Sequence, residues 1–194
     1  MRDITNQTTG SEFFLTGEEQ QILLRIAKEA VTYAAEHGKR ATFSVDPALL
    51  SSSLESECGA FVTLYKKGRL RGCIGHLTGD MPLWKMVREM AFASSLRDYR
   101  FSTVTEEELP DIKIEISVLS PLKKIGSPGE IILGKHGIYI VKGGKSGVFL
   151  PQVATETGWS REEFLGHCAR DKAGIGWDGW KSAEIYIFTA EIFG

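Results

Sequence analysis

The sequence predicts an α+β fold in which helices flank a mainly antiparallel sheet. Helical and strand-like patterns alternate along the 194 residues, and several strand-like segments are joined by short turns rather than by helical crossovers. With 42% hydrophobic and 25% charged residues, the chain has the composition of a soluble globular protein that can bury a core. We expect residues 1–13 to form a flexible polar tail and residues 14–194 to form a single domain.

Four segments carry the signals of helix formation. Thr16 and Glu19 form a capping box before an amphipathic stretch that ends at Gly38. A short helix is expected from Asp46, because Pro47 occupies a position that tolerates proline. The other two segments are residues 79–95, with an apolar face of Leu83, Met86, Val87, Met90 and Ala91, and residues 160–174, with a second capping box at Ser160 and Glu163.

The strand-like segments follow a period of two. Residues 60–77 predict two strands joined by a KKGR turn, in which Gly68 takes a positive φ. In residues 111–121 four apolar side chains alternate with polar ones, which is typical of a half-buried strand: Ile112, Ile114, Ile116 and Val118. Residues 130–153 contain three short apolar runs divided by glycines, and GGKSG predicts a hairpin turn. Residues 184–193 predict a final strand.

Composition and motifs exclude several classes of function. A formal net charge of −2 disfavours nucleic-acid binding. The three cysteines, Cys58, Cys73 and Cys168, have neither CxxC nor zinc-ligand spacing, so we expect no metal and no disulfide framework. There is no phosphate-binding loop motif, and we expect no cofactor. No signal peptide or membrane span is apparent, which favours a cytoplasmic protein that binds no membrane.

The segment LRGCIGHL, residues 70–77, raises the main functional question. In a strand, Arg71 and Cys73 share one face, and Leu70 and Ile74 on the other face point to the core. A guanidinium near the sulfur favours the reactive thiolate form. Gly72 and Gly75 allow a ligand or another backbone to approach closely. The alternative is that Cys73 is a small buried residue without reactivity.

Four longer segments carry a family resemblance. They are GAFVTLYKKGRLRGCIG, RDYRFSTVTEEELPDIKIEISVLSPL, GKHGIYIVKGGKSGVFLPQVATETGW and FLGHCARDKAGIG, and from about Thr16 onward the chain resembles the AMMECR-domain family. The resemblance implies a cytoplasmic fold of two unequal lobes, with LRGCIG lining the cleft between them. It also implies component A of the AmmeMemoRadiSam system, with Memo-like and radical-SAM proteins as partners. The activity of the family is not established.

The chain departs from the family pattern at two places. Tyr99 stands where many members have proline, and Ser94 and Ser95 stand where many have alanines. We expect the tyrosine to weaken a turn while leaving Asp98 and Arg100 available. The two serines are expected to be a mild change in packing.

These observations give a candidate active site. Cys73 would be the nucleophile and His136, between two glycines, the base. Lys172, at the end of a predicted helix, joins them because the resemblance places the matching lysine near the cleft. Ligand-binding candidates are Arg71, Gly72, Gly75, Glu115 and Gln152. Arg71 and Lys172 together suit an anionic ligand.

The remaining histidines are weaker candidates. His76 lies on the strand face opposite Cys73 unless a bulge at Gly75 reverses it, and His37 and His167 are expected to be structural.

Two functions remain open on this evidence. The first is an enzyme that uses Cys73 on a small anionic or carbonyl substrate. The second is a non-catalytic module that binds a partner protein or a ligand in the same cleft.

Overall fold

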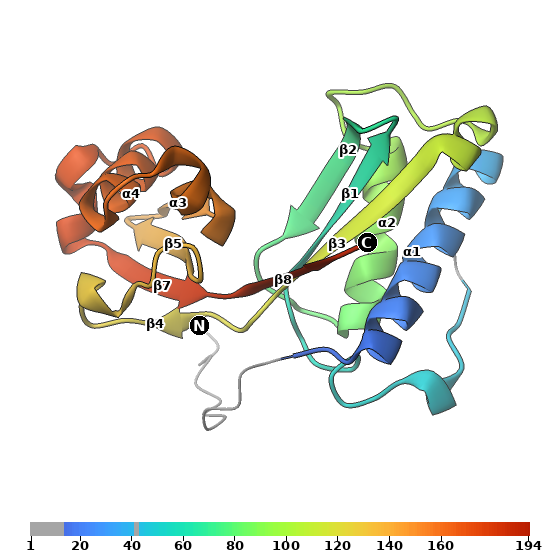
Figure 1. Cartoon of the computed structure of the whole chain (residues 1–194), viewed down its shortest axis with the longest axis horizontal. Coiled ribbons are helices and arrows are strands. Elements are labelled where there is room, and N and C mark those ends of the chain that lie inside the picture. The colour runs from blue at the N-terminus through green and yellow to red at the C-terminus, as the bar shows by residue number, and fades with distance from the viewer. Residues whose placement is uncertain (1–13, 41–42) are drawn as a thin grey trace.

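The computed structural model describes residues 14–40 and 43–194 of the chain. They form two four-stranded antiparallel sheets, each with a hydrophobic core of its own (Figure 1). We name the parts the first lobe (residues 14–40, 43–119 and 190–193) and the second lobe (residues 123–188). The predicted α+β class with antiparallel pairing is confirmed, whereas the predicted tail, residues 1–13, lies outside the described residues.

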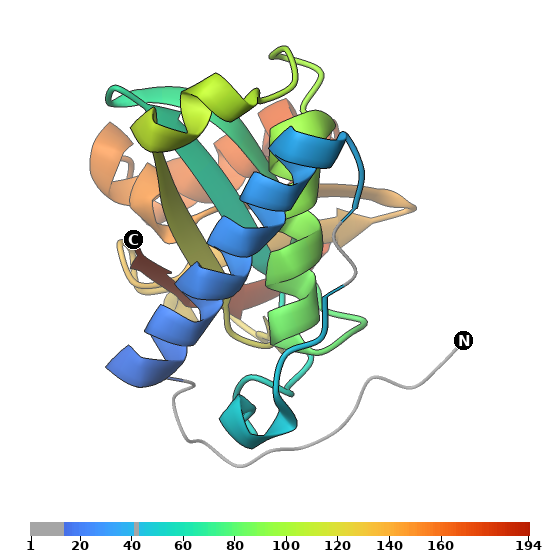
Figure 2. The same ribbon diagram turned by 90° about the vertical axis from the view of Figure 1, so that its right-hand side faces the viewer.

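The first lobe consists of a sheet with two long helices on one face. Its strand order is β2-β1-β3-β8. The strands are β1 (Ala60–Lys66), β2 (Arg69–His76), β3 (Ile112–Leu119) and β8 (Ala190–Phe193), and the helices are α1 (Gly17–His37) and α2 (Leu83–Leu96). Short 3-10 turns, η1 (Pro47–Leu49) and η2 (Glu106–Asp111), flank them. In Figure 2, α1 and α2 lie side by side in front of the sheet, and the second lobe lies behind it.

Local sequence signals fix the ends of these elements. The Thr16 side chain accepts the backbone N–H of Glu19, and the Glu19 side chain accepts the N–H of Thr16, as the capping box predicts. Gly38 ends α1 in the left-handed conformation. Lys67 and Gly68 form the turn between β1 and β2, both with positive φ, which matches the twist of a tight hairpin.

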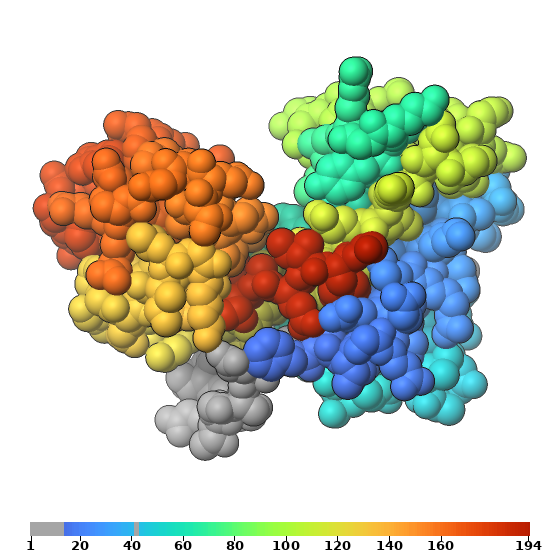
Figure 3. Space-filling model, in the orientation of Figure 1, coloured from blue at the N-terminus to red at the C-terminus, as the bar shows by residue number. Residues whose placement is uncertain are grey.

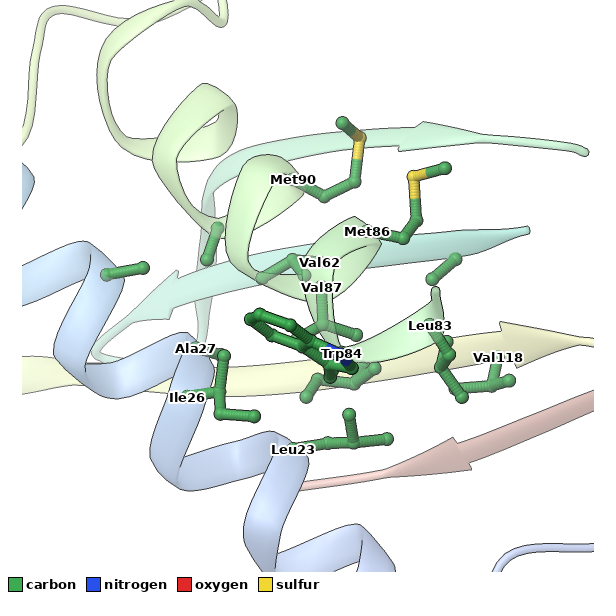
Figure 4. Packing of buried hydrophobic residues seen from close by; sticks show 14 of the residues in the cluster. Leu23, Ile26, Ala27, Val62, Leu83, Trp84, Met86, Val87, Met90 and Val118 are labelled. Carbon is green, nitrogen blue, oxygen red and sulfur yellow. The ribbon is translucent and has the colours of Figure 1, made fainter. Parts of the chain in front are cut away.

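The core of the first lobe lies between the helices and the sheet. Figure 4 shows side chains of α1 and α2 meeting Val62 of β1 and Val118 of β3. All five residues of the predicted apolar face of residues 79–95 are buried there. The methionines Met86 and Met90 fill this core.

The second lobe is smaller and has its own sheet, in the order β4-β7-β5-β6. The strands are β4 (Lys123–Lys124), β5 (Gly137–Lys142), β6 (Lys145–Phe149) and β7 (Glu184–Phe188). The helical elements are η3 (Pro128–Glu130), α3 (Pro151–Thr157), α4 (Arg161–His167), the π-helical turn η4 (Cys168–Lys172) and η5 (Trp177–Ser182). Helix α3 was not expected from the sequence, and the predicted helix over residues 160–174 divides into α4 and η4.

Two chain segments join the lobes side by side. The backbone N–H of Ser120 donates to the carbonyl oxygen of Thr189 at 3.0 Å, and the Thr189 N–H donates to Ser120 Oγ at 2.9 Å. Thr189 divides the predicted final strand into β7 of the second sheet and β8 of the first. Figure 3 shows the surface hollowed between the lobes, with β8 at the bottom of the hollow.

Within the described ranges, no helix is both long enough and apolar enough to cross a membrane.

Candidate functional site

Three polar side chains form a row across the first sheet, on the face that the helices leave uncovered. In the strand register Thr63 of β1 lies opposite Cys73 of β2 on one side and Glu115 of β3 on the other. The neighbouring residues Val62 and Leu64 are buried on the helix side, so the row points the other way. That face is turned toward the second lobe (Figure 2).

The Cys73 thiol lies in a setting different from those of the other two cysteines. It is half-buried, and the Thr63 hydroxyl donates to its sulfur at 3.3 Å. Cys58 and Cys168 are buried, and burial raises the pKa of both thiols, that of Cys168 to about 12. Among the three cysteines, Cys73 is therefore the one that solvent and a ligand can reach.

The backbone of Cys73 is held from both sides by an ion pair in the segment after α2. Asp98 Oδ2 accepts the Cys73 N–H at 2.8 Å, and Arg100 Nη2 donates to the Cys73 carbonyl oxygen at 3.0 Å. Arg100 also donates two hydrogen bonds to the Asp98 carboxylate, from Nε to Oδ1 at 2.8 Å and from Nη2 to Oδ2 at 2.6 Å. These hydrogen bonds lower the pKa of the buried Asp98 carboxyl to about 2 and raise the pKa of Arg100.

A phenol and a carboxylate lie at the other end of the row. The Tyr65 hydroxyl donates to Glu115 Oε1 at 3.3 Å. The pKa of Tyr65 is raised, first by burial and then by the negative charges of Glu115 and Cys73. Tyr65 is thus within electrostatic reach of both residues and keeps its proton at neutral pH.

Arg71 does not have the role that the alternation predicted. Its Nε and Nη2 bind both oxygens of Glu108, at 3.0 and 2.8 Å, and its guanidinium also bonds the carbonyls of Ser102 and Thr103. A register shift in the β1–β2 ladder, where Leu64 pairs with Gly72 and Tyr65 with Leu70, leaves Arg71 as the extra, bulged residue.

The cation that contacts Cys73 is Arg100 instead. The bulge lies at Arg71 and not at Gly75, so the register keeps His76 opposite Ala60, where His76 is exposed at the end of β2.

The two glycines beside Cys73 serve packing. A Cβ at Gly72 would overlap the backbone carbonyl oxygen of Ser94 in α2, and one at Gly75 would overlap the Phe61 ring. At Gly72 the missing side chain makes room for the backbone of α2 and not for a ligand.

The other predicted site residues lie in the second lobe. His136 Nδ1 accepts the N–H of Ile132 at 3.1 Å, and burial lowers the pKa of this histidine. Lys172 lies over the Phe149 ring at 5.7 Å, and Gln152 is half-buried in α3. Among residues 14–40 and 43–194, no hydrogen bond or ion pair joins any of them to Cys73. Their participation remains a prediction.

Comparison with known proteins identifies the family. A family model described as AMMECR1 matches residues 24–193. The chain belongs to the AMMECR1 family. A relative from Methanopyrus kandleri is 39% identical over 190 residues, covering 92% of this chain and 89% of its own, and one from Methanosarcina mazei is 35% identical, covering 92% of each. The crystal structure of an uncharacterized protein, PH0010, from Pyrococcus horikoshii is 36% identical with a TM-score of 0.72, covering 88% of both chains.

Several residues near Cys73 make contacts that the sequence does not reveal. The segment RDYRF of this chain contains Asp98 and Arg100, but nothing in the sequence shows that they hold the backbone of a strand 25 residues earlier. Ser94, expected to be a mild packing change, donates to the Val62 carbonyl at 2.7 Å and accepts the Ile74 N–H at 2.9 Å. Tyr99, at the expected proline, is almost fully exposed.

A separate cavity of about 650 Å³ lies on the first lobe of this AMMECR1-family chain, at the C-terminal ends of α1 and α2. Its lining includes Phe92, Arg97, Glu106 and Glu107, but neither cysteine nor histidine. The sheet face that bears Cys73, by contrast, has the nucleophile and the proton-transfer groups. We therefore place the candidate site there.

Proposed function

We propose that this chain is a thiol-dependent enzyme acting on a small carbonyl or anionic substrate in the hollow between its lobes. The observation that supports it is the row of Cys73, Thr63 and Glu115, with Tyr65 beside it, on an uncovered sheet face. Such a row supplies a nucleophile and two groups able to move a proton within one site. The free cysteines fit a reducing, cytoplasmic setting.

The proposed step is addition of the thiol to a carbonyl group. The Cys73 thiol gives its proton to the Thr63 hydroxyl oxygen, which lies between the two residues in the row, while the Thr63 hydroxyl proton passes to the Glu115 carboxylate. Cys73 Sγ then forms a bond with the carbonyl carbon. The electron pair of the C=O bond moves to oxygen, which accepts a hydrogen bond from the Tyr65 hydroxyl. Tyr65 is free to donate there because a protonated Glu115 no longer needs its hydrogen bond.

The experiment is alkylation of Cys73 by iodoacetamide across a pH series, in the wild type and in Glu115→Gln and Tyr65→Phe. We expect Glu115→Gln to slow alkylation at neutral pH by about a hundredfold, the lower end of what a general base contributes. Exposed Glu57 provides the matched control as Glu57→Gln, which should leave the rate unchanged. Identical pH profiles for the wild type and Glu115→Gln would remove the base from the proposal.

A second candidate function is a binding module that uses the same hollow without chemistry. It is favoured by one observation: in the described part of the chain no imidazole contacts the Cys73 sulfur. The occupant would then be a ligand or a partner protein, and the Memo-like and radical-SAM proteins are the first partners to test. Binding of such a partner by Cys73→Ser at the wild-type affinity would favour this alternative.

A further inference from the structure

Arg100 is held in one orientation before any ligand arrives. Its Nε and Nη2 both bind Asp98, whose side chain is almost completely buried, and Nη2 also bonds the Cys73 carbonyl oxygen. A guanidinium fixed by two partners loses little conformational freedom when it binds a third. The hydrogen bond to the Cys73 carbonyl oxygen also holds the guanidinium against the backbone of the residue that bears the thiol.

One nitrogen of this guanidinium is unused. Among the described residues Arg100 Nη1 makes no hydrogen bond, and the side chain is 45% exposed. Arg71 provides the contrast, because all three of its nitrogens are bonded within the protein and its side chain is only 11% exposed. Within the described ranges, Arg100 therefore has a whole Nη1 amino group free for a ligand, whereas each nitrogen of Arg71 already has a protein partner.

The charges along the sheet face determine how an anionic ligand would be oriented. Glu115 lies two strands away from Cys73, and its carboxylate repels an anion. Arg100 contacts Cys73 from the segment after α2, at the β2 edge of the sheet, and attracts one. A substrate with an anionic end would therefore place that end at Arg100 and its electrophilic carbon at the sulfur.

We propose that Arg100 Nη1 binds the carboxylate of a small substrate whose electrophilic carbon is directly attached to that carboxylate or one atom away. This inference rests on the proposed thiol chemistry, because it defines the substrate class for the same site. It assigns to Arg100 the anion-binding role that was predicted for Arg71 and Lys172.

The test compares two alkylating reagents that differ in charge. Iodoacetate and iodoacetamide both form a C–S bond at a CH₂ carbon and lose iodide with its electron pair, but only iodoacetate has a carboxylate on that carbon. We expect the iodoacetate-to-iodoacetamide rate ratio at Cys73 to fall about tenfold in Arg100→Gln, as loss of a charge-assisted hydrogen bond predicts. Arg97→Gln, on an exposed arginine three residues away, should keep the wild-type ratio.

One further variant keeps the result interpretable. Arg100→Lys retains the charge and should keep part of the ratio, and it replaces Arg100→Gln if circular dichroism shows that variant unfolded. Equal ratios in the wild type and in the folded Arg100 variants would overturn the inference.

A titration separates this inference from the proposed enzyme. Sodium acetate is added to ¹⁵N-labelled protein at constant ionic strength, with chloride as the control anion, and the Cys73 and Arg100 amide resonances are followed. We expect saturable shifts that persist in Cys73→Ser and disappear in Arg100→Gln. Shifts in Cys73→Ser combined with an unreactive wild-type thiol would remove the enzyme and keep the anion site. If neither the wild type nor Cys73→Ser shows shifts specific to acetate, the anion site is ruled out, whatever the reactivity of the thiol.

Discussion

The buried carboxylate of Asp98 accepts the backbone N–H of Cys73 at 2.8 Å, although the two residues are 25 positions apart. The same carboxylate orients Arg100, which returns a hydrogen bond to the Cys73 carbonyl. One acidic residue after α2 therefore positions both the strand that bears the thiol and an arginine that contacts the same residue. Because β2 is an edge strand, these bonds also occupy backbone groups that no neighbouring strand pairs.

Asp98→Asn should destabilise the fold. The amide cannot accept hydrogen bonds as strongly as the carboxylate, and Arg100 loses its ionic partner, so we expect a loss of about 2 kcal/mol in the free energy of unfolding. Urea denaturation followed by circular dichroism measures it. Asp178→Asn, at an exposed ion pair with Lys181, is the matched control and should change stability by less than about 0.5 kcal/mol. Equal effects of the two substitutions would contradict the clamp.

Stability should fall as the pH drops from about 4.5 to about 2. The hydrogen bonds of Arg71 and Lys66 lower the pKa of Glu108 from 4.5 to about 2, and those of Arg100 lower the pKa of Asp98 from 3.8 to about 2. A lowered folded-state pKa means that the unfolded chain binds more protons in this window, so acid favours unfolding. Urea midpoints measured along this range should show a shallower decline in Glu108→Gln than in the wild type. Parallel curves would show that Glu108 does not contribute.

Ser94→Ala should cost more than the same change at the next residue. Ser94 bridges β1 and β2 through the Val62 carbonyl and the Ile74 N–H, and its loss leaves both without this partner, at about 1–2 kcal/mol. The Ser95 hydroxyl bonds only the Ala91 carbonyl within its own helix, so Ser95→Ala should change stability by less than about 0.5 kcal/mol. Thermal or urea unfolding measures the loss of stability in each of the two variants. The reverse order of effects would show that the bridge does not matter.

Gly72→Ala should be strongly destabilising because α2 packs directly on β2 at this point. The added methyl group meets the Ser94 carbonyl oxygen, which belongs to helix backbone and cannot move aside without shifting α2. We expect a loss of about 3 kcal/mol or an insoluble protein. Gly126→Ala, where an added methyl group meets nothing within 4 Å, should be tolerated. A stable Gly72→Ala variant would mean that α2 lies farther from the strand.

Local patterns predicted most of the first lobe. The capping box at Thr16, the apolar face of residues 79–95 and the alternation of residues 112–118 each specify an element from neighbouring residues alone, and each is observed. Helix α3 was missed because Pro151 and Gln152 follow a strand with no capping side chain. The pattern of residues 184–193 predicts a single strand, because its division at Thr189 depends on which sheet each half joins.

The site was harder to predict for a physical reason. Alternation placed Cys73 on the outer face correctly, but a bulge turned Arg71 toward Glu108, and a bulge has no local signature here. Arg100 and Tyr65 were missed as site residues because their proximity to Cys73 arises from the packing of the segment after α2 and from strand register. Such long-range contacts are not encoded in any one motif.

The most direct test of the account is the relative reactivity of the three cysteines in the folded protein. The chain is treated with iodoacetamide at neutral pH, digested, and the modification of Cys58, Cys73 and Cys168 is followed by mass spectrometry over time. We expect rapid, selective labelling of Cys73, with the two buried cysteines modified only after unfolding in denaturant. Labelling of Cys73 as slow as that of Cys58 and Cys168 would contradict the reachable thiol on which the proposed function depends.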